Sequence, residues 1–527
     1  MAINALKDIA WIPTARGRMT ARDVLCSSAT VPNNSSRNTL STQDLLINPG
    51  FSAGSSLRIL RDIAVLAERI RKQKGSKVAP EEPDIDAIDE AIESLAPYCN
   101  PLNADYPFLQ RQVISGQETD GAPKKLSPAM APDSAEAFWK MSFTFANQLS
   151  LDKAVLWLAI NHHYSLAGNN QYDGEKCAMG APGIRFLGVD KKKDVGKTIT
   201  EVFFIKDSIY ETLLMNIPID WLEYNDFPAW ALRNPESLGK DHPLWDASWS
   251  SNTAVCVWEG NMLTSAKPCG IPRHWYSQAH GVCPSAKKDK AAKEQENARK
   301  KSWWDNRNTR DPLYLYTPNK DGILKPQRLD FGRDATDLAV HWNAEQNPQY
   351  MEYSSTTRIL HHDAESYLCF LRHQLGGTPS SPVIRASEVL IPDDNSLWSP
   401  HKDLYEIAEM YANVVLDMQK KLVFCFGKPT QPNIPTLSNL GFLRGDVSTV
   451  FWRHIRPIFE NSMRENQLED ENNYSEILKA TQKATMSAFD EVTLPYAQSM
   501  VPEVTTTHQY LREKLGKIVN VALEGMK

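Results

Sequence analysis

Residues 404–422 read LYEIAEMYANVVLDMQKKL, and their apolar positions recur at the three- and four-residue spacing of one helix face. The members of this face are Leu404, Ile407, Ala408, Tyr411, Val414, Val415, Met418 and Leu422. Gly427 and Pro429 follow, and both residue types are typical of a helix end. Three further helical stretches lie near 446–465, 473–492 and 502–524. Four amphipathic helices with short or moderate connections indicate an antiparallel four-helix bundle.

The chain before this bundle has a different character. From about 100 to 400, Pro and Gly are frequent and helical runs are short, with β-like pieces at Thr198–Ile205 and Thr253–Trp258. We therefore expect an α+β fold, in which a loop-rich mixed α/β N-terminal domain over residues 1–398 precedes a C-terminal four-helix bundle over residues 399–527.

Two helices are expected near the N-terminus, after an irregular and polar stretch over residues 1–48. Ser55 and Ser56 resemble an N-cap, and Gly75 follows Lys72 and Lys74 as a helix end does. The apolar face between them consists of Leu57, Leu60, Ile63, Ala64, Ala67 and Ile70. A second helix is expected over 84–96, because Pro83 and an acidic stretch precede it.

The composition is that of a folded protein whose cysteines are expected to be free thiols. Of 527 residues, 42% are hydrophobic and 23% are charged, with 58 basic against 64 acidic side chains and a formal charge of −6. No apolar run reaches the length of a membrane span, and the first residues lack the order of a signal peptide. We expect a cytoplasmic protein that does not contact a membrane, with its eight scattered cysteines as thiols.

Known catalytic and nucleotide-binding motifs are missing. The sequence contains no GxxxxGK[ST], no GxGxxG after a strand and no HExxH. The pairs His162–His163 and His361–His362 are adjacent residues, which point about 100° apart on a helix and therefore do not readily share a metal. We expect these histidines to be structural, and we expect neither a catalytic site nor a cofactor.

One cysteine- and histidine-bearing region leaves two interpretations open. Cys256, Cys269, His280 and Cys283, with His274 nearby, have loop lengths that could fold round a zinc ion, which takes four N or S ligands. The paired CxxC knuckles of most structural zinc sites are missing here. Ordinary thiols and loop histidines are the interpretation we favour, and a zinc site is the alternative.

Two further segments carry features of nucleic-acid contact. Lys287–Lys301 reads KKDKAAKEQENARKK, a local charge of +4 in an acidic protein, and Trp303 and Trp304 follow. It is either a solvated loop or helix face, or a flexible basic finger that meets DNA phosphates. Gly168–Gly188 contains five glycines with Asn and Gln between them; glycine permits close backbone approach and amide side chains can read base edges.

In order along the chain, these pieces resemble the large subunit of the type I-E CRISPR Cascade complex, the CasA or Cse-one family. Residues 9–14 (IAWIPT) resemble its opening Trp-Ile-Pro, and Tyr106–Gln110 resembles its His-Pro-Phe-Met-Gln. Phe145–Gln148 resembles its Phe-Val-Asn-Gln loop, and Gly168–Gly183 falls at its glycine-rich loop. Leu494–Ala497 matches a Pro-Tyr-Ala in the helical end. The resemblance covers most of the chain as an ordered series of short motifs.

The resemblance implies roles for individual residues. Phe145 and Asn147 would contact the RNA end and the motif that flanks the target, and the backbone of the glycine-rich loop would approach the minor groove. Lys293, with Lys290 as its neighbour, would donate to minor-groove acceptors. The family's wedge hairpin corresponds to Gly376–Pro382, where its Gln is missing. The candidate DNA-contacting residues are Phe145, Asn147, Gly168, Asn169, Asn170, Gly174, Lys290, Lys293, Ser380 and Ser381.

The function that the resemblance implies is recognition without catalysis. Such a subunit reads the protospacer-adjacent motif in the minor groove, helps to open the duplex for R-loop formation and recruits a helicase-nuclease. Its partners would be double-stranded target DNA, guide RNA, the helicase-nuclease and the other Cascade subunits, namely the backbone, small and guide-end-binding subunits. A metal-dependent nuclease built on the Cys256–Cys283 region and a purely structural scaffold are the alternatives.

Overall fold

The structure, a computed structural model, describes residues 3–27, 40–48, 50–79, 82–112, 121–127, 148–164, 171–172, 175–176, 198–231, 242–250, 252–270, 290–291, 294, 298, 311, 313–318, 321–322, 324–326, 328–329, 335–345, 367–378, 381–390, 405–464 and 467–525. By its internal contacts the chain divides into two compact units. The first consists of residues 1–331, 352–361 and 370–389, and the second of residues 332–351, 362–369 and 390–527.

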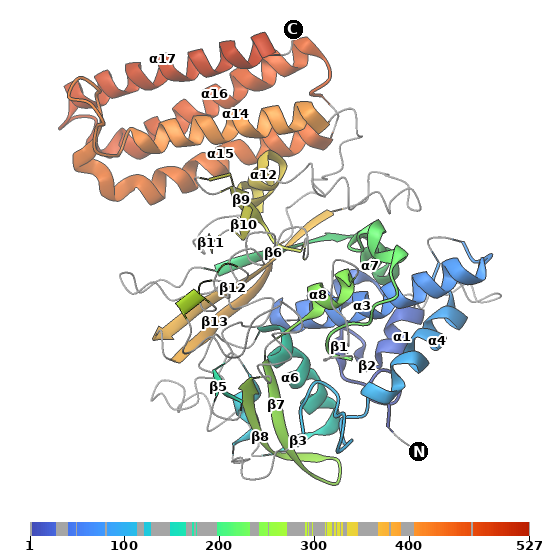
Figure 1. Ribbon diagram of the computed structural model, residues 1–527. Helices are drawn as coiled ribbons and strands as arrows, with labels where there is room; N and C mark the ends of the chain where they lie inside the picture. The colour runs from blue at the N-terminus through green and yellow to red at the C-terminus, as the bar shows by residue number, and fades with distance from the viewer. Residues whose placement is uncertain are drawn as a thin grey trace. The chain divides into compact units, whose positions relative to one another are not determined.

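The described part of the second unit contains four long helices and one shorter helix. They are α12 (Ala335–Glu345), α14 (Tyr405–Phe424), α15 (Arg444–Arg464), α16 (Glu471–Thr493) and α17 (Val501–Gly525), with the 3-10 helices η7 (Ser438–Leu443) and η8 (Leu494–Tyr496) between them. The four long helices lie side by side (Figure 1). The predicted four-helix bundle is therefore confirmed, with α12 packed against α14 and α15 as an addition.

The buried face of α14 is the apolar face that its sequence predicts. Ala408, Tyr411, Val415, Met418 and Leu422 are each at most 1% exposed. The Tyr411 ring stacks on Phe459 at 5.9 Å between centroids, and its hydroxyl shares a 3.0 Å hydrogen bond with Thr481 of α16. Helical periodicity alone thus identified the inner face, because every fourth or third residue must meet the same neighbours.

Residues 1–48 are not simply irregular, so that prediction is wrong for the described ones. They contain β1 (Ile12–Thr14), β2 (Gly17–Met19), α1 (Ala21–Cys26) and α2 (Thr42–Leu46). Thr20 caps α1, and Ser41 forms a capping box with Asp44 at the start of α2. Helices of five or six residues are too short to show periodicity, and only their caps mark them in the sequence.

The helix α3 (Gly50–Lys74) is buried along most of its length in the first unit. Ser55 and Ser56 lie inside α3 and are buried, so the predicted N-cap is wrong. The small side chains in this turn serve packing instead: a Cβ added to Gly54 would lie far closer than 3.0 Å to the Tyr164 hydroxyl of α6 (Leu151–Tyr164). The predicted end of α3 is confirmed, with Gly75 at φ +59°.

Other short helices of the first unit lie between its strands. They are α4 (Ile85–Leu95), α7 (Ile209–Met215) and α8 (Pro243–Ser248), with the 3-10 helices η1 (Ala96–Tyr98), η2 (Pro123–Leu126) and η3 (Ile219–Glu223). The start of α4 was predicted correctly, since Asp84 caps it by accepting from the amide of Ala87. Among the described residues, no helix is long and apolar enough to cross a membrane.

The strands form several small sheets. Their bounds are β3 (Leu149–Ser150), β4 (Gln171–Tyr172), β5 (Glu175–Lys176), β6 (Thr198–Ile205), β7 (Asn252–Glu259), β8 (Met262–Gly270), β9 (Tyr316–Pro318), β10 (Leu324–Pro326), β11 (Arg328–Leu329), β12 (Tyr367–Thr378) and β13 (Ser381–Leu390). One sheet has the order β11-β6-β12-β13 and another the order β3-β8-β7; β1-β2, β4-β5 and β9-β10 are two-stranded. The predicted strands β6 and β7 are confirmed, while β8, β12 and β13 were not predicted.

Candidate functional site

Most of the predicted DNA-contacting residues lie outside the described residues. They are Phe145, Asn147, Gly168, Asn169, Asn170, Gly174, Lys293 and Ser380. Lys290 and Ser381 are described. The structure also describes the helices and strands that come directly before or after these residues in the chain. These elements locate the starting points of the candidate segments in the first unit.

Two of the candidate segments adjoin elements that contact the same strand. Asn147 comes just before β3, which pairs with β8 through Leu149 opposite Leu263. The glycine-bearing segment leads into β4, which pairs with β5 and contacts β8. Segments that the resemblance assigns to the RNA end and to the minor groove therefore adjoin one sheet of the first unit.

The predicted wedge region coincides with a strand connection. Residues Gly376–Pro382 include the last three residues of β12 and the first two of β13, and only two residues separate these neighbouring strands. Two-residue connections are typical of β-hairpins. Ser381 is the first residue of β13.

The basic segment has helical, solvent-exposed members. Lys290, Ala291, Glu294 and Ala298 are all in helical conformation and exposed. Lys290, Glu294 and Ala298 follow one another at intervals of four residues, about one helical turn, so they lie along one side of a helix. An exposed helix face fits a solvated surface and a DNA-contacting surface equally, so geometry alone does not choose between the two interpretations.

The register of β7 and β8 argues against the zinc alternative. Cys256 pairs with Ala266, whereas Cys269 pairs with Thr253, three residue pairs further along. Three residue pairs correspond to about 10 Å along an antiparallel strand, which separates the backbones of Cys256 and Cys269. A zinc ion binds each cysteine sulfur at a Zn–S distance of about 2.3 Å, so two cysteine ligands must lie close together. His280 and Cys283 lie outside the described residues. Within the described part of the chain, no group of three potential metal ligands occurs.

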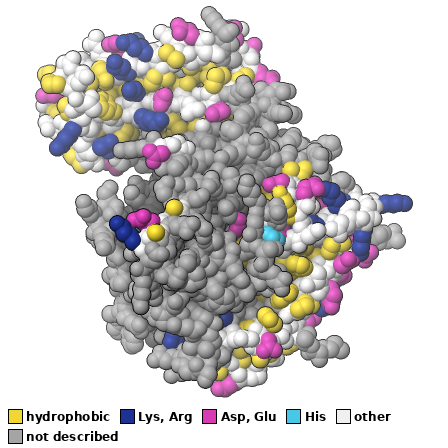
Figure 2. Space-filling model, viewed as in Figure 1, with side chains coloured by type: hydrophobic (Ala, Val, Ile, Leu, Met, Phe, Trp, Pro, Cys, Tyr) yellow, Lys and Arg dark blue, Asp and Glu magenta, His cyan; other side chains and the backbone are white. Residues whose placement is uncertain are grey.

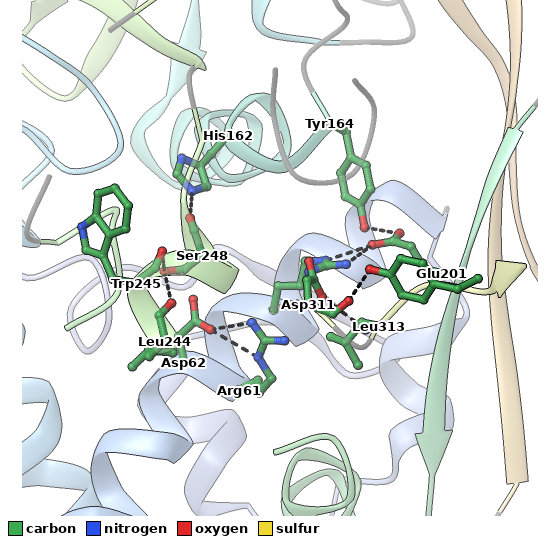
Figure 3. Close-up of polar contacts among 12 residues, drawn as sticks. Arg61, Asp62, His162, Tyr164, Glu201, Leu244, Trp245, Ser248, Asp311 and Leu313 are labelled. Carbon is green, nitrogen blue, oxygen red and sulfur yellow. Dashed lines mark hydrogen bonds and ion pairs between the residues drawn. The ribbon is translucent and has the colours of Figure 1, made fainter. Parts of the chain in front are cut away.

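The two adjacent histidines of α6 are structural, as predicted. Nε2 of His162 lies 3.0 Å from the carbonyl oxygen of Ser248 (Figure 3). Nδ1 of His163 lies 3.0 Å from the carbonyl oxygen of Ala159. Both side chains are buried, and their rings are perpendicular at 4.8 Å. Burial lowers the pKa of His163 well below its ordinary value, with the neighbouring His162 adding to the effect.

A buried polar cluster, which the sequence did not reveal, centres on Glu201 of β6. One carboxylate oxygen accepts from Nε and a terminal nitrogen of Arg58, at 2.9 and 2.7 Å. The other accepts from the Tyr164 hydroxyl at 2.6 Å (Figure 3). The same oxygen lies 3.2 Å from Nε2 of His373. Arg58 also pairs with Asp311 at 3.1 Å. We call these five residues the Glu201 cluster; all are at most 3% exposed.

The Arg58 guanidinium pairs with both carboxylates of the Glu201 cluster. Burial by itself would raise the pKa of Glu201, but the Arg58 guanidinium, assisted by the hydrogen bond from His373, holds that pKa below its ordinary value. Burial, together with the Glu201 charge, raises the pKa of Tyr164 well above its ordinary value. At neutral pH the carboxylate is therefore an acceptor only, and the tyrosine hydroxyl remains its donor.

Two further buried ion pairs on α3 join that helix to the loop and helices after β6. Asp62 pairs with Arg61 at 3.0 Å and accepts from the Trp230 indole at 2.9 Å. Arg69 donates to the carbonyl of Trp221 and to both the carbonyl and the carboxylate of Asp226, at 2.6 to 2.9 Å. These pairs satisfy every charge with a partner, which buried charges require, and they hold α3 in its unit.

The Tyr106–Gln110 segment, which carries part of the resemblance, is a fixed structural corner. Phe108 packs edge-on against Trp230 at 5.6 Å. The Gln110 side chain donates to the carbonyls of Pro101 and Phe108 and accepts from the Trp258 indole at 3.1 Å. Leu109 has a φ of +57°, which is rare for a residue with a side chain. Such a backbone persists only where the surroundings determine it.

One sign of the buried charges is present in the sequence of α3. The apolar residues Ile59, Val65 and Leu66 of α3 fall outside the single face it predicted, and all are buried. Apolar residues on more than one face indicate a helix that is buried on more than one face, and Arg58 and Arg61 within it then need acceptors inside the protein. The sequence does not show which residues accept these hydrogen bonds, because the acceptors of Arg58, Glu201 and Asp311, lie 143 and 253 residues away in the chain.

A protein-family comparison finds one match. Residues 53–252 match the family of CRISPR-associated protein Cse1. These residues include α3, α6, β6 and most of the elements around the Glu201 cluster. A search of curated protein sequences finds no relative.

Comparison with solved structures extends the likeness to the whole chain. The crystal structure of Thermus thermophilus CasA has a TM-score of 0.60 at 14% identity and covers 99% of this chain and 100% of its own. Cse1 from Acidimicrobium ferrooxidans has a TM-score of 0.57 at 14% identity, with 99% of each chain covered. Thermobifida fusca Cse1 has a TM-score of 0.55 at 13% identity, covering 99% of this chain and 98% of its own. Residues 53–252 therefore match the Cse1 family of CRISPR-associated proteins, and the chain has along its whole length the fold of solved CasA and Cse1 structures.

Proposed function

We propose that this protein is the DNA-recognition subunit of a type I CRISPR RNA-guided complex. It reads the protospacer-adjacent motif in the minor groove, helps to open the duplex and recruits the helicase-nuclease. The observation that carries this proposal is the Cse1 family match over residues 53–252 together with the CasA fold of the full chain. The candidate contacts are the segment that ends at Asn147, the glycine-bearing segment before β5, the helical basic segment and the β12–β13 hairpin.

The physics of the minor groove suits this division of labour. That groove offers a degenerate pattern, mainly A·T against G·C, so a subunit reading it tolerates several motifs. Guide pairing then supplies the sequence specificity, and the protein needs few base contacts. A hairpin wedge partly unstacks one base step at a cost of about a few kcal/mol. An acidic protein with one segment of local charge +4 is consistent with a few focused DNA contacts.

The experiment that tests motif reading replaces Lys290 and Lys293 by Ala in the assembled complex. A lost minor-groove contact costs about 1–3 kcal/mol, so binding to motif-bearing duplex should weaken about ten-fold or more. A target with a pre-opened bubble should be affected much less, because guide pairing there does not wait for motif capture. Both affinities are measured at one salt concentration, since phosphate contacts vary with salt.

A matched control removes the same charge elsewhere. Lys420 and Lys421 are exposed lysines of α14, and their replacement by Ala should leave both affinities unchanged. An equal loss on duplex and bubble in the Lys290/Lys293 variant would make this segment a general phosphate contact. Wild-type affinity on both targets would assign it to the solvated surface.

We also propose that the four-helix unit carries contacts with other Cascade subunits. Phe442 and Leu494 are 69% and 73% exposed, and the Phe442 ring lies 6.3 Å from that of Tyr496, which makes an exposed apolar cluster at η7 and η8. On the face in view, hydrophobic side chains of this unit lie among Lys and Arg (Figure 2). Exposed apolar clusters of this kind are typical of interaction sites.

Changing Phe442 and Leu494 to Asp should therefore weaken incorporation into the guide-RNA complex without unfolding the chain. The control is Ile47→Asp, an equally exposed apolar residue of the first unit at 66%. Full incorporation of the Phe442/Leu494 variant would remove this cluster from the docking surface.

The metal-dependent nuclease alternative has its own test. We propose a non-catalytic subunit, because no nucleophile–base or metal-ligand motif occurs in the sequence. The purified chain should leave plasmid DNA intact with Mg²⁺, Mn²⁺ or Zn²⁺ present. Cleavage that is lost in a Cys256→Ser and Cys269→Ser variant would establish the alternative.

A further inference from the structure

Glu201 is bonded to three separate elements of the first unit. Arg58 reaches it from α3, Tyr164 from α6 and His373 from β12. Because an ionised carboxylate only accepts hydrogen bonds, Nε2 of His373 carries the proton of the third contact. Both carboxylate oxygens therefore have two donors each, and a single side chain on β6 fixes the spacing of all three elements.

Two of these partners lie on elements that precede candidate DNA-contacting segments in the chain. Tyr164 is the last residue of α6, seven residues before β4. His373 lies in β12 five residues before its last residue, Thr378, which is about 17 Å at the rise of a strand. The C-terminal end of α6 and strand β12 therefore meet at one buried carboxylate.

Burial makes this junction stiff. Glu201 and Tyr164 are 1% and 0% exposed, so neither can exchange its partner for water. Gly54 on α3 leaves room for the Tyr164 hydroxyl and nothing larger. A binding site depends on supporting elements whose side chains are locked by packing and hydrogen bonds, and the Glu201 cluster locks α3, α6 and β12 in this way.

We propose that Glu201 is a positioning residue for motif reading, which fixes the C-terminal end of α6 and strand β12 relative to each other. This proposal rests on the proposed function, because it assumes that the segments that follow these two elements contact the DNA. Glu201 itself is buried and does not touch nucleic acid. Its effect is transmitted through the hydrogen bonds to Tyr164 and His373.

The test measures motif discrimination by the assembled complex, as the ratio of affinities for duplexes with the correct and an altered motif. Glu201→Gln keeps the shape but loses the charge, and Tyr164→Phe removes one hydrogen bond. Each should lower the ratio by about ten-fold or more, the equivalent of one lost charge-assisted bond. Affinity for the bubble target should stay within about three-fold of wild type, because motif capture is bypassed there.

Conservative rescue and a matched control separate positioning from stability. At position 373, Gln can donate where Nε2 does and should retain more discrimination than Leu. Asp62→Asn neutralises another buried carboxylate paired with an arginine of α3, at 0% exposure, and should leave the ratio unchanged. Thermal unfolding of each variant shows that the complex contains folded protein; if Glu201→Gln does not assemble, Tyr164→Phe decides.

The outcomes separate the two proposals. A wild-type complex with no motif discrimination overturns the proposed function itself. Discrimination that is present in wild type and unchanged in folded Tyr164→Phe overturns the positioning role alone. An equal loss in Asp62→Asn also overturns it, because the effect would then follow from general destabilisation of the unit.

Discussion

Replacing Gly54 by Ala is the sharpest test of how α3 packs against α6. The added Cβ would lie far closer than 3.0 Å to the Tyr164 hydroxyl, 3.0 Å from Cδ1 of Leu371 and 3.1 Å from Cζ of Tyr164. Tyr164 is fully buried and cannot turn into solvent. The ring must therefore move, and its 2.6 Å hydrogen bond to Glu201 must break or lengthen.

The cost follows from three contributions. Overpacking of a close-packed core costs about 1–3 kcal/mol, and a lost hydrogen bond to a charged group costs about 1.5–3 kcal/mol. The better helix propensity of Ala offsets about 0.8–1.0 kcal/mol. We expect Gly54→Ala to lower the unfolding free energy of the first unit by about 2–5 kcal/mol.

The assay is native-state hydrogen exchange of the α3 and α6 amides, which reports the opening of this unit separately from the helical one. The same substitution is then made in a Tyr164→Phe background, where the clashing oxygen is gone. There Gly54→Ala should cost at least about 1.5 kcal/mol less than in wild type. Equal costs in the two backgrounds would show that the hydroxyl does not lie over Gly54, and the reasoning would fail.

Three other outcomes are expected. Arg69→Met should lower the free energy of unfolding by about 3–5 kcal/mol, because it leaves buried acceptors and a buried carboxylate unpaired. Arg453→Met breaks an exposed ion pair and should lower it by at most about 1 kcal/mol. Chemical denaturation measures both losses. Leu511→Ala in the bundle core should lower the free energy of unfolding by about 2–5 kcal/mol. Val521 is 68% exposed, and Val521→Ala should change that free energy by less than about 0.5 kcal/mol. Equal losses in the two variants would mean that the buried and exposed faces of α17 are assigned wrongly. The pKa of Glu201 is lower in the folded protein than in the unfolded chain, so the unfolded chain binds a proton at Glu201 more readily. The stability that the ionised Glu201 contributes is therefore complete above about pH 4.5, the ordinary pKa of this side chain. This stability is lost as the pH falls through the pKa of the folded protein. Hydrogen exchange at a series of pH values should show this acid-side loss in wild type and not in Glu201→Gln, and identical pH profiles would contradict the assignment.

The sequence by itself determined the helical end of the protein and several isolated elements. The four long helices of the bundle, the end of α3 at Gly75, the cap of α4 at Asp84 and the strands β6 and β7 all follow from local patterns. Such patterns repeat within one or two turns, so a few neighbouring residues contain the whole signal. The ordered short motifs also sufficed to suggest the family.

Local signals failed where elements were short or where packing overrode them. Ser55 and Ser56 resembled an N-cap, but the helix begins at Gly50 because their small side chains are needed inside a close helix contact. The helices α1 and α2 are too short for periodicity and were missed. The strands β12 and β13 were also missed, in a region that composition alone describes as loop-rich.

Only the tertiary structure decided which charges meet. Glu201 joins Arg58, Tyr164 and His373 from positions 143, 37 and 172 residues away. No local pattern predicts such a contact, because it depends on where the sheet places β6 relative to α3, α6 and β12. In water these side chains would be ordinary solvated polar groups; burial makes each of them require its partner. That requirement turns four scattered residues into one junction of α3, α6, β6 and β12.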